Sequence, residues 1–505
     1  MAIDVLVVGA GNAALSAAVA AREQGARRVV VLEKAPRELR GGNTHYSGGL
    51  FRFAYDAAED LRPLVPDVER QVPGFFASVE PYPQARFRED LERVTEGRTD
   101  PMLAELLIGR SYDTVRWLAR QGVPLEAAVS LSGVKTGATI KFSPGAVIRA
   151  RGEGVGLSRA WFEIAERRGV EIRYETWAVD LVQDRRGRVT GVVARSPGGL
   201  EAIAARAVVL GCGGFESNPE WRARYLGRPW DSAKVRGTRY NTGDGLRMAM
   251  AVGALPHGQW TGCHSTPIDA DAPPFGDRRL TDKTNRLSYP WGVLVNVAGR
   301  RFFDEGEDFQ FYTYAKLGGI ILGQPRGVAF QIFDAKVASL LEGRYKTGTP
   351  IVADSLEDLV GRLPVDRAAC RRTLEEYDAA LGEGRFDPTA LDGLAARGIQ
   401  PAKSNWAQRL DSSPFVAYAV TGGITFTFGG VRVDEQARVI GPAWAPVPGL
   451  YACGEMVGGI FSTNYPGGSG LMSGAVFGRI AGAAAAGHPP TRSASRRRAT
   501  RRRPS

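Results

Sequence analysis

The stretch IDVLVVGAGNAALSAAVAAREQGARRVVVLEK, from Ile3 to Lys34, decides the fold class. Val5–Val8 is a continuous apolar run of the kind that forms a buried parallel strand. It is followed by the pattern G-x-G-x-x-A, an alanine-rich helix, and a second apolar run, Val29–Leu32, that ends in Glu33. This order and spacing of strand, turn, helix, strand and acid predicts a βαβ unit that binds a dinucleotide.

The βαβ unit carries the groups that hold such a ligand. Its glycines permit a tight turn and let a pyrophosphate approach the amino end of the helix, where backbone N–H groups are free. The acid at the end of the second strand can accept hydrogen bonds from ribose hydroxyls. The residues predicted to contact the cofactor here are Gly9, Gly11, Asn12, Ala13, Ala14, Glu33 and Lys34.

Four later segments offer backbone N–H groups and small side chains for the same ligand. They are Arg40–Gly49 (RGGNTHYSGG), Ala207–Gly214 (AVVLGCGG), Asn241–Gly245 (NTGDG) and Leu450–Glu455 (LYACGE). Singly, each is also typical of an ordinary turn; together they predict contacts to one large cofactor from end to end of the chain. The predicted contacts are Gly41, Gly42, Asn43, Thr44, Ser47, Gly48, Gly49, Cys212, Gly213, Gly214, Thr242, Asp244, Gly454 and Glu455.

Length and composition limit the class of protein. A chain of 505 residues is too long for one hydrophobic core, and 44% hydrophobic with 24% charged residues is typical of a soluble globular protein. The four cysteines form no C-x-x-C pair, so we expect no metal, iron–sulfur or c-type haem site. We find no signal peptide and no apolar run long enough to span a bilayer, and therefore expect a cytoplasmic protein that is not an integral membrane protein.

The net charge of +11 is concentrated at the end of the chain. The segment Arg492–Ser505 contains seven arginines and no acid, which leaves a net charge of about +4 (11 minus 7) for the rest of the chain. We expect residues 491–505 to be a disordered basic tail. The tail is either a solvated extension or a contact for an anionic partner, and because the body has no nucleic-acid-binding motif, no nucleic acid is expected.

The ordered set GAGNAA, GGNTHYSGG, CGGF, NTGDG, ACGE and YPGGSGLMSGAVFGRIAG resembles the fumarate reductase and succinate dehydrogenase flavoprotein family. Within this family the chain is most similar to tricarballylate dehydrogenases, through GQWTGCHS, FYTYAK and AVTGGITFTFGG. The resemblance implies an α/β fold with a Rossmann-like FAD-binding domain at 1–258 and 424–490. This domain is interrupted by an α+β cap, or substrate domain, at 259–423.

The resemblance also implies that the cofactor is FAD. Members with covalent FAD attach it through a histidine at the position that is Asn43 here, so we predict non-covalent FAD; His45, two residues on, is the alternative attachment point. Further cofactor contacts implied by the resemblance are Ala178, Val179, Ser469, Gly470 and Leu471.

Family members move a hydride between a carbon and flavin N5 while a proton leaves or joins the neighbouring carbon. This implies a dehydrogenase that desaturates a C–C bond next to an electron-withdrawing group, and our leading prediction is tricarballylate to cis-aconitate. The family pattern is changed at three places. The arginine that moves the proton after R-F-x-x-E (Arg301–Glu305) is absent, a histidine pair is replaced by Thr425–Phe426, and a carboxylate-binding arginine is replaced by Tyr465.

Other groups must therefore exchange the proton and hold the substrate. On a strand, Tyr312 and Tyr314 would face one side, and a nearby cation, Arg286, Arg301 or Lys316, would have to lower the pKa of a tyrosine base. The predicted catalytic residues are Tyr314, Tyr312, Tyr465, His264 and Lys316. The predicted substrate-binding residues are His264, Thr266, Arg286, Tyr465 and Gly468.

Two alternatives stay open. The string Tyr465-Pro466-Gly467-Gly468 also resembles 3-ketosteroid dehydrogenases, which favours a related desaturase or reductase for a ketone or a specialised metabolite. The other is a non-catalytic flavin electron carrier, which would need no closed substrate pocket. We expect a small-molecule substrate, most simply a polycarboxylate, and an electron acceptor protein or a quinone-linked iron–sulfur partner.

Overall fold

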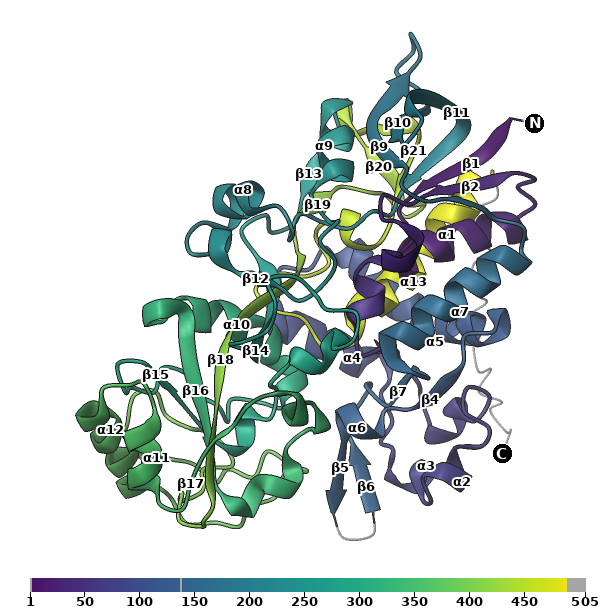
Figure 1. Ribbon diagram of the computed structural model, residues 1–505. Helices are drawn as coiled ribbons and strands as arrows, with labels where there is room; N and C mark the ends of the chain where they lie inside the picture. Colours follow the sequence, from purple (N-terminus) through teal and green to yellow (C-terminus); the bar gives the residue numbers. More distant parts are fainter. Residues whose placement is uncertain (1, 137–138, 488–505) are drawn as a thin grey trace, which may run out of the picture.

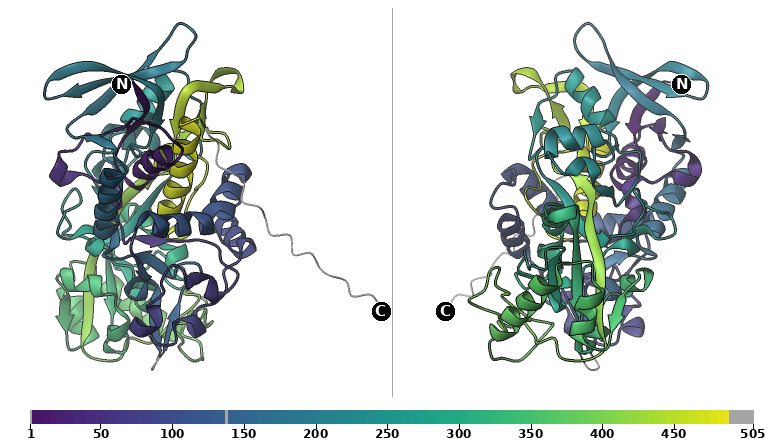
Figure 2. Two further views of the ribbon diagram at one scale, coloured as in Figure 1. Left: turned by 90° about the vertical axis from the view of Figure 1, so that its right-hand side faces the viewer. Right: turned by 60° about the vertical axis from the view of Figure 1, so that its left-hand side comes forward.

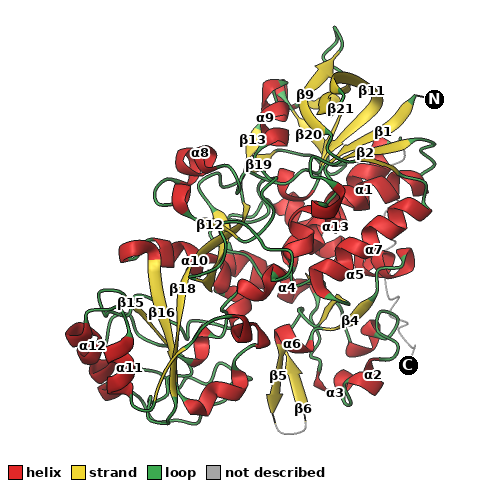
Figure 3. Cartoon of the chain, viewed as in Figure 1, coloured by secondary structure: helices red, strands yellow, loops and turns green. Residues whose placement is uncertain are grey.

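The computed structural model describes residues 2–136 and 139–487, so the basic tail lies outside the described residues. A first sheet has the strand order β20-β21-β11-β1-β2-β8, with β10 paired to β11 and β9 to β10 (Figures 1 and 3). Its parallel strands are β1 (Ile3–Val8), β2 (Val29–Leu32), β8 (Glu171–Arg173), β11 (Gly199–Leu210) and β21 (Pro446–Ala452). The antiparallel strands are β9 (Trp177–Gln183), β10 (Val189–Ser196) and β20 (Arg438–Ile440).

Helix α1 (Asn12–Glu23) follows β1, as the sequence predicts, and packs against α13 (Ser469–Ala485). Glycine in α13 makes this close approach possible. A Cβ atom on Gly478 would lie 2.3 Å from the Ala13 carbonyl oxygen, and one on Gly482 would lie 2.0 Å from that of Ala17. Helices α5 (Pro101–Gln121) and α7 (Glu153–Arg167) pack against α13 and α1.

A second sheet is built around the long strand β18 (Phe415–Thr427), with the order β12-β18-β16-β15 and with β14 and β17 also paired to β18. Figure 2 shows β18 running along this part of the molecule. The partners are β12 (Lys234–Val235), β14 (Cys263–Asp269), β15 (Val293–Asn296), β16 (Val328–Phe333) and β17 (Ile351–Ala353). The helices beside this sheet are α10 (Tyr314–Leu322), α11 (Leu356–Arg362) and α12 (Arg367–Ala379).

Shorter elements complete the chain. The helices are α2 (Val68–Gln71), α3 (Phe75–Ser78), α4 (Gln84–Val94), α6 (Val129–Ser132), α8 (Pro219–Trp221) and α9 (Asp244–Ala251). The strands are β3 (Leu50–Phe51), β4 (Leu125–Ala127), β5 (Gly133–Thr136), β6 (Thr139–Phe142), β7 (Ile148–Ala150), β13 (Pro256–His257) and β19 (Gly430–Val431). In the part of the chain that the structure describes, no helix is both long and apolar enough to cross a bilayer. The mixed α/β fold class is confirmed.

The expected strand at Tyr312 and Tyr314 is wrong. Gln310–Tyr312 is a 3-10 turn, and Tyr314 begins helix α10. This helix packs closely on β14, because a Cβ atom on Gly318 would lie 2.6 Å from the carbonyl carbon of Ser265. The two tyrosines therefore do not face one side of a strand, and their hydroxyl groups have different hydrogen-bond partners: Asp90 for Tyr312 and Tyr465 for Tyr314.

Candidate active site

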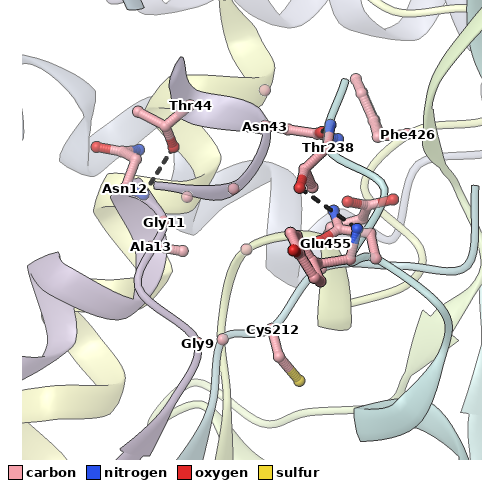
Figure 4. Close-up of a pocket in the computed structure, with 18 of the residues that line it drawn as sticks. Gly9, Gly11, Asn12, Ala13, Asn43, Thr44, Cys212, Thr238, Phe426 and Glu455 are labelled. Atoms are coloured by element: carbon pink, nitrogen blue, oxygen red, sulfur yellow. Dashed lines mark hydrogen bonds between the residues drawn. The ribbon is translucent and has the colours of Figure 1, made fainter. Parts of the chain in front are cut away.

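A cavity with about 1490 Å³ of empty space, its open mouth included, lies at the carboxyl ends of β1, β2 and β11. Ligands of open α/β sheets bind at this edge. Most of the predicted cofactor contacts line it (Figure 4). They are Gly9, Gly11, Asn12, Ala13, Glu33, Lys34, Gly42, Asn43, Thr44, Ser47, Ala178, Cys212, Gly213, Asp244, Gly454, Glu455, Gly470 and Leu471.

Eight predicted contacts do not line the cavity: Ala14, Gly41, Gly48, Gly49, Val179, Gly214, Thr242 and Ser469. Several of them support the wall from behind. A Cβ atom on Gly214 would lie 2.2 Å from a carboxylate oxygen of Glu455, and the Thr242 hydroxyl accepts a hydrogen bond from Lys34 Nζ at 2.7 Å. The predicted motifs therefore lie at the cavity, but the sequence did not show which residues of each motif face it.

The first βα turn forms a cradle for a phosphate. Gly9 has φ +100°, and a Cβ atom there would lie 2.6 Å from the Gly211 carbonyl oxygen. Gly11 precedes α1 in an extended conformation and provides no side-chain cap, so the backbone N–H groups that follow Asn12 in the first turn of α1 can bind an anion. The Asn12 N–H donates to the Thr44 hydroxyl at 2.8 Å, which fixes the adjoining loop (Figure 4).

Glu33, the acid that directly follows β2, also lines the cavity. Glu33 is buried, and burial raises its pKa to about 7. Its carboxylate accepts the Ala35 N–H at 2.8 Å. Ribose hydroxyls would supply further donors that favour its charged form. The neighbouring Lys34 forms an ion pair with Asp244 at 2.9 Å.

The two candidate positions for covalent attachment differ in their surroundings. Asn43 lines the cavity, and its amide nitrogen donates to Glu216 and to the Thr425 carbonyl oxygen, both at 2.7 Å. Its amide oxygen accepts the Thr238 N–H at 2.9 Å. His45 is buried outside the cavity lining, where burial and then the charge of Arg278 lower its pKa to about 4. These positions fit a cofactor held without a covalent bond.

Two buried carboxyl groups lie at this part of the cavity: Glu455 lines it, and Glu216 does not. Burial raises the pKa of Glu455 to about 7 and raises the pKa of Glu216 well above its ordinary value. Glu455 accepts the Thr427 N–H at 2.7 Å, and Glu216 accepts from Asn43 and Asn241. The pair keeps a proton at neutral pH, since two buried like charges cannot both ionise cheaply.

At its far end the cavity has an aromatic wall, which we define as His264, Phe426, Phe428, Phe461 and Tyr465. The His264 ring stacks on Phe426 at a centroid distance of 5.0 Å and meets Tyr465 edge-on at 4.7 Å. Its Nδ1 is buried without a hydrogen-bond partner in the described residues. Burial, and then the charge of Arg236, lower the pKa of His264 well below its ordinary value, so the ring is neutral.

Tyr314 reaches the aromatic wall through Tyr465. Their hydroxyl oxygens are 2.5 Å apart, and Tyr314 also packs edge-on against His264 at 5.0 Å. Burial raises the pKa of both tyrosines, that of Tyr314 well above its ordinary value. The expectation of a lowered tyrosine pKa is therefore wrong in this structure, because burial outweighs the nearby cations.

The cations proposed for that role have other partners. Arg286 pairs with Asp269 at 2.5 Å, Arg301 with Glu305 at 2.5 Å, and Lys316 with Glu307 at 2.6 Å. None of these three cations lines the cavity.

The remaining predicted site residues do not line the cavity. Tyr312 donates to Asp90 at 2.7 Å, and Thr266 donates to Asn285 at 2.8 Å. Gly468 precedes α13, and its carbonyl oxygen accepts the Arg52 N–H at 3.1 Å. Of the predicted substrate-binding and catalytic residues, the structure thus brings together His264, Tyr314 and Tyr465.

Sequence reasoning missed Arg236, which lines the cavity. It is buried, and its guanidinium donates to the Thr425 hydroxyl and to the Tyr46 carbonyl oxygen, both at 3.0 Å. It forms no ion pair with a carboxylate of the described residues, and burial lowers its pKa. A buried arginine without a counter-ion is an anion-binding group. The only sequence signal was an arginine shortly before the NTGDG segment.

Comparisons with known proteins agree with this geometry. A family model described as an FAD binding domain matches residues 4–471. The fumarate reductase (cytochrome) of Shewanella frigidimarina is 28% identical over 489 residues, which cover 96% of this chain and 77% of that protein. The 4-oxocyclohexanecarboxylate 2-dehydrogenase of Sinomonas cyclohexanicum is 28% identical over 546 residues, which cover 96% of this chain and 93% of that protein.

Solved structures show the same fold. The open conformation of a flavocytochrome c3 fumarate reductase matches with a TM-score of 0.71 and 26% identity, over 96% of this chain and 78% of that chain. The 3-ketosteroid Δ1-dehydrogenase from Sterolibacterium denitrificans matches with a TM-score of 0.72 and 20% identity, over 96% of this chain and 99% of that chain.

Proposed function

The chain belongs to the family described as an FAD binding domain, and we propose that it desaturates the C–C bond next to a carbonyl group in a substrate with one anionic group. Its cofactor is FAD, and it is an FAD-dependent oxidoreductase acting on C–C bonds. The observation that carries the finer proposal is the Tyr314–Tyr465 hydrogen bond at a cavity end that also contains Arg236.

We propose that FAD is bound without a covalent link, with its pyrophosphate at the Gly9–Asn12 turn and its ribose at Glu33. When bound, FAD supplies the acceptor for a hydride from the substrate. The fully hydrogen-bonded amide of Asn43 supports the non-covalent assignment. Acid precipitation should release all of the flavin into the supernatant; yellow colour that stays with the pellet would contradict it.

The chain's own residues move the proton. Tyr465 lines the cavity and takes the proton from the carbon next to the carbonyl group, while Tyr314 donates a hydrogen bond to the Tyr465 oxygen and stabilises its deprotonated form. In the reverse direction Tyr465 returns the proton. The aromatic wall excludes water from this exchange. We propose that residues 259–423 act as the cap.

The cavity favours a substrate with an apolar body. At the aromatic end, Arg236 is the one cation without an acid partner among the described lining residues, and it suits one carboxylate. A tricarboxylate would need more such groups. The relative named as a 4-oxocyclohexanecarboxylate 2-dehydrogenase supports a ketone with one carboxylate. Tricarballylate, which the sequence motifs favour, is the second candidate, since Arg236 and His264 can hold one of its carboxylates.

The test is a product analysis with an artificial electron acceptor and two substrates, 4-oxocyclohexanecarboxylate and tricarballylate. We expect the unsaturated ketone to form at the higher kcat/KM. Formation of cis-aconitate alone would move the assignment to the second candidate. A quinone-linked iron–sulfur partner or another acceptor protein, and the cytoplasmic location, stay predictions.

A further inference from the structure

A second arginine lies buried beside the tyrosine pair. Arg52, which directly follows β3, is 0% exposed. Its Nε donates to the Gly467 carbonyl oxygen at 2.8 Å, and its backbone N–H donates to the Gly468 carbonyl oxygen at 3.1 Å. These bonds fix Arg52 to the loop that directly follows Tyr465.

The charge of Arg52 is only partly balanced. The nearest carboxylate, Asp90 on α4, lies 3.7 Å from its guanidinium. The hydroxyl groups of Tyr82 and Tyr312 stand between them: each accepts from Arg52, at 2.8 and 3.0 Å, and each donates to Asp90 at 2.7 Å. Asp90 is shared, because Arg93 also donates to it at 3.0 Å.

One amino group of Arg52 has no partner. Its Nη2 is buried and makes no hydrogen bond within the described residues. The charged and titratable groups that act on the Tyr314–Tyr465 pair are Arg52 and Arg236, together with the neutral His264 that packs against both rings. Arg236 faces the cavity, so a bound anion would neutralise it, whereas Arg52 keeps its charge behind the wall.

We propose that Arg52 is a positioning residue whose fixed charge sets the proton affinity of the Tyr314–Tyr465 pair, and that Asp90 determines how much of this charge the pair experiences. The inference rests on the proposed proton transfer at Tyr465. Removing Arg52 would make the pair hold its proton more tightly. Neutralising Asp90 would do the opposite, because the arginine charge would then be unopposed.

The experiment compares Arg52→Gln, Arg52→Lys and Asp90→Asn by stopped-flow flavin reduction with 4-oxocyclohexanecarboxylate from pH 6 to pH 10. For Arg52→Gln, we expect the plot of log rate against pH to move about one unit to higher pH, which is roughly tenfold in rate at fixed pH. Asp90→Asn should move it to lower pH, and Arg52→Lys should restore the wild-type plot. Opposite displacements are not produced by a merely structural role.

Asp90 and Glu80 both line a separate cavity, which also includes Arg86, Arg93 and Tyr312. Glu80→Gln is the matched control, since Glu80 is exposed and paired with Arg86. It should leave the plot unchanged. Displacements of Arg52→Gln and Asp90→Asn in the same direction, or none, would overturn the inference. If Asp90→Asn fails to fold, the comparison of Arg52→Gln with Arg52→Lys tests the inference. A plot displaced for Arg52→Gln and unchanged for Arg52→Lys supports it, and any other result overturns it. If instead Tyr465→Phe reacts at the wild-type rate, the proposed proton transfer is wrong, independently of these displacements.

Discussion

The hydroxyl oxygens of Tyr314 and Tyr465 lie 2.5 Å apart although 151 residues separate them in the sequence. Tyr314 begins the helix that packs on β14, and Tyr465 lies in the loop before α13. Their contact joins the first residue of helix α10, beside the second sheet, to the loop at the cofactor cavity. The proton-transfer proposal depends on this contact.

Removal of either hydroxyl should slow catalysis without loss of the cofactor. For Tyr465→Phe we expect substrate-driven flavin reduction to fall by about 10²- to 10⁴-fold, the usual contribution of a positioned acid or base. For Tyr314→Phe the rate should fall less, because Tyr314 acts on the substrate only through Tyr465. The control is Tyr377→Phe, a buried tyrosine that donates to the Gln408 carbonyl oxygen away from the cavity. Equal losses in all three variants would contradict the assignment.

The two reaction directions should respond differently to pH. Burial raises the pKa of Tyr314 and Tyr465 above the ordinary value of 10.0, so the pair is protonated at neutral pH. Dehydrogenation needs the deprotonated form and should become faster as pH rises toward 10. Reduction of the unsaturated product by the reduced enzyme needs the protonated form and should not become faster. Initial rates in both directions from pH 6 to pH 10 test this, and parallel pH profiles would contradict it.

Arg236→Leu should weaken binding of a substrate carboxylate. Loss of one partner of a buried charged hydrogen bond costs about 2 kcal/mol or more, which is roughly 30-fold in Kd. The matched ligand is 4-oxocyclohexanecarboxamide, which is neutral and should bind the wild type and the variant with a much smaller difference. Titration of the oxidised flavin spectrum measures both. A similar loss for the two ligands would show that Arg236 only supports the fold.

Gly11→Ala should remove FAD affinity while the apoprotein stays folded. Gly11 has an ordinary negative φ of −82°, and a Cβ atom there would meet nothing closer than the Thr44 hydroxyl at 3.5 Å, so its methyl group would enter the phosphate cradle. Gly343→Ala is the control, because a Cβ atom there has no neighbour within 4 Å. FAD fluorescence quenching measures affinity and thermal unfolding of the apoprotein measures stability. Unchanged FAD affinity would show that the pyrophosphate does not bind at Gly11.

The sequence predicted best those features that are determined by residues close together along the chain. The strand, glycine turn, helix and acid of Ile3–Glu33 are specified by their own spacing, and the structure has them. Arg236 was missed because Thr425, its hydrogen-bond partner, lies 189 residues away. It is positioned by the two-residue strand β12, which has no periodic pattern.

The errors at Arg286 and Tyr312 have the same physical origin. The partner of Arg286 is Asp269 and that of Tyr312 is Asp90, and neither pairing is visible in a sequence motif. The expected strand at Tyr312 and Tyr314 failed because tertiary packing on β14 outweighed the local preference of aromatic residues.

The most direct test of the central claim is anaerobic mixing of the purified yellow protein with 4-oxocyclohexanecarboxylate while the absorption of the oxidised flavin is followed. We predict that the flavin band bleaches with wild-type protein and that Tyr465→Phe, at equal FAD content, bleaches at least 100-fold more slowly. A wild-type flavin that dithionite reduces but that neither this ketone nor tricarballylate bleaches would contradict the proposed desaturation.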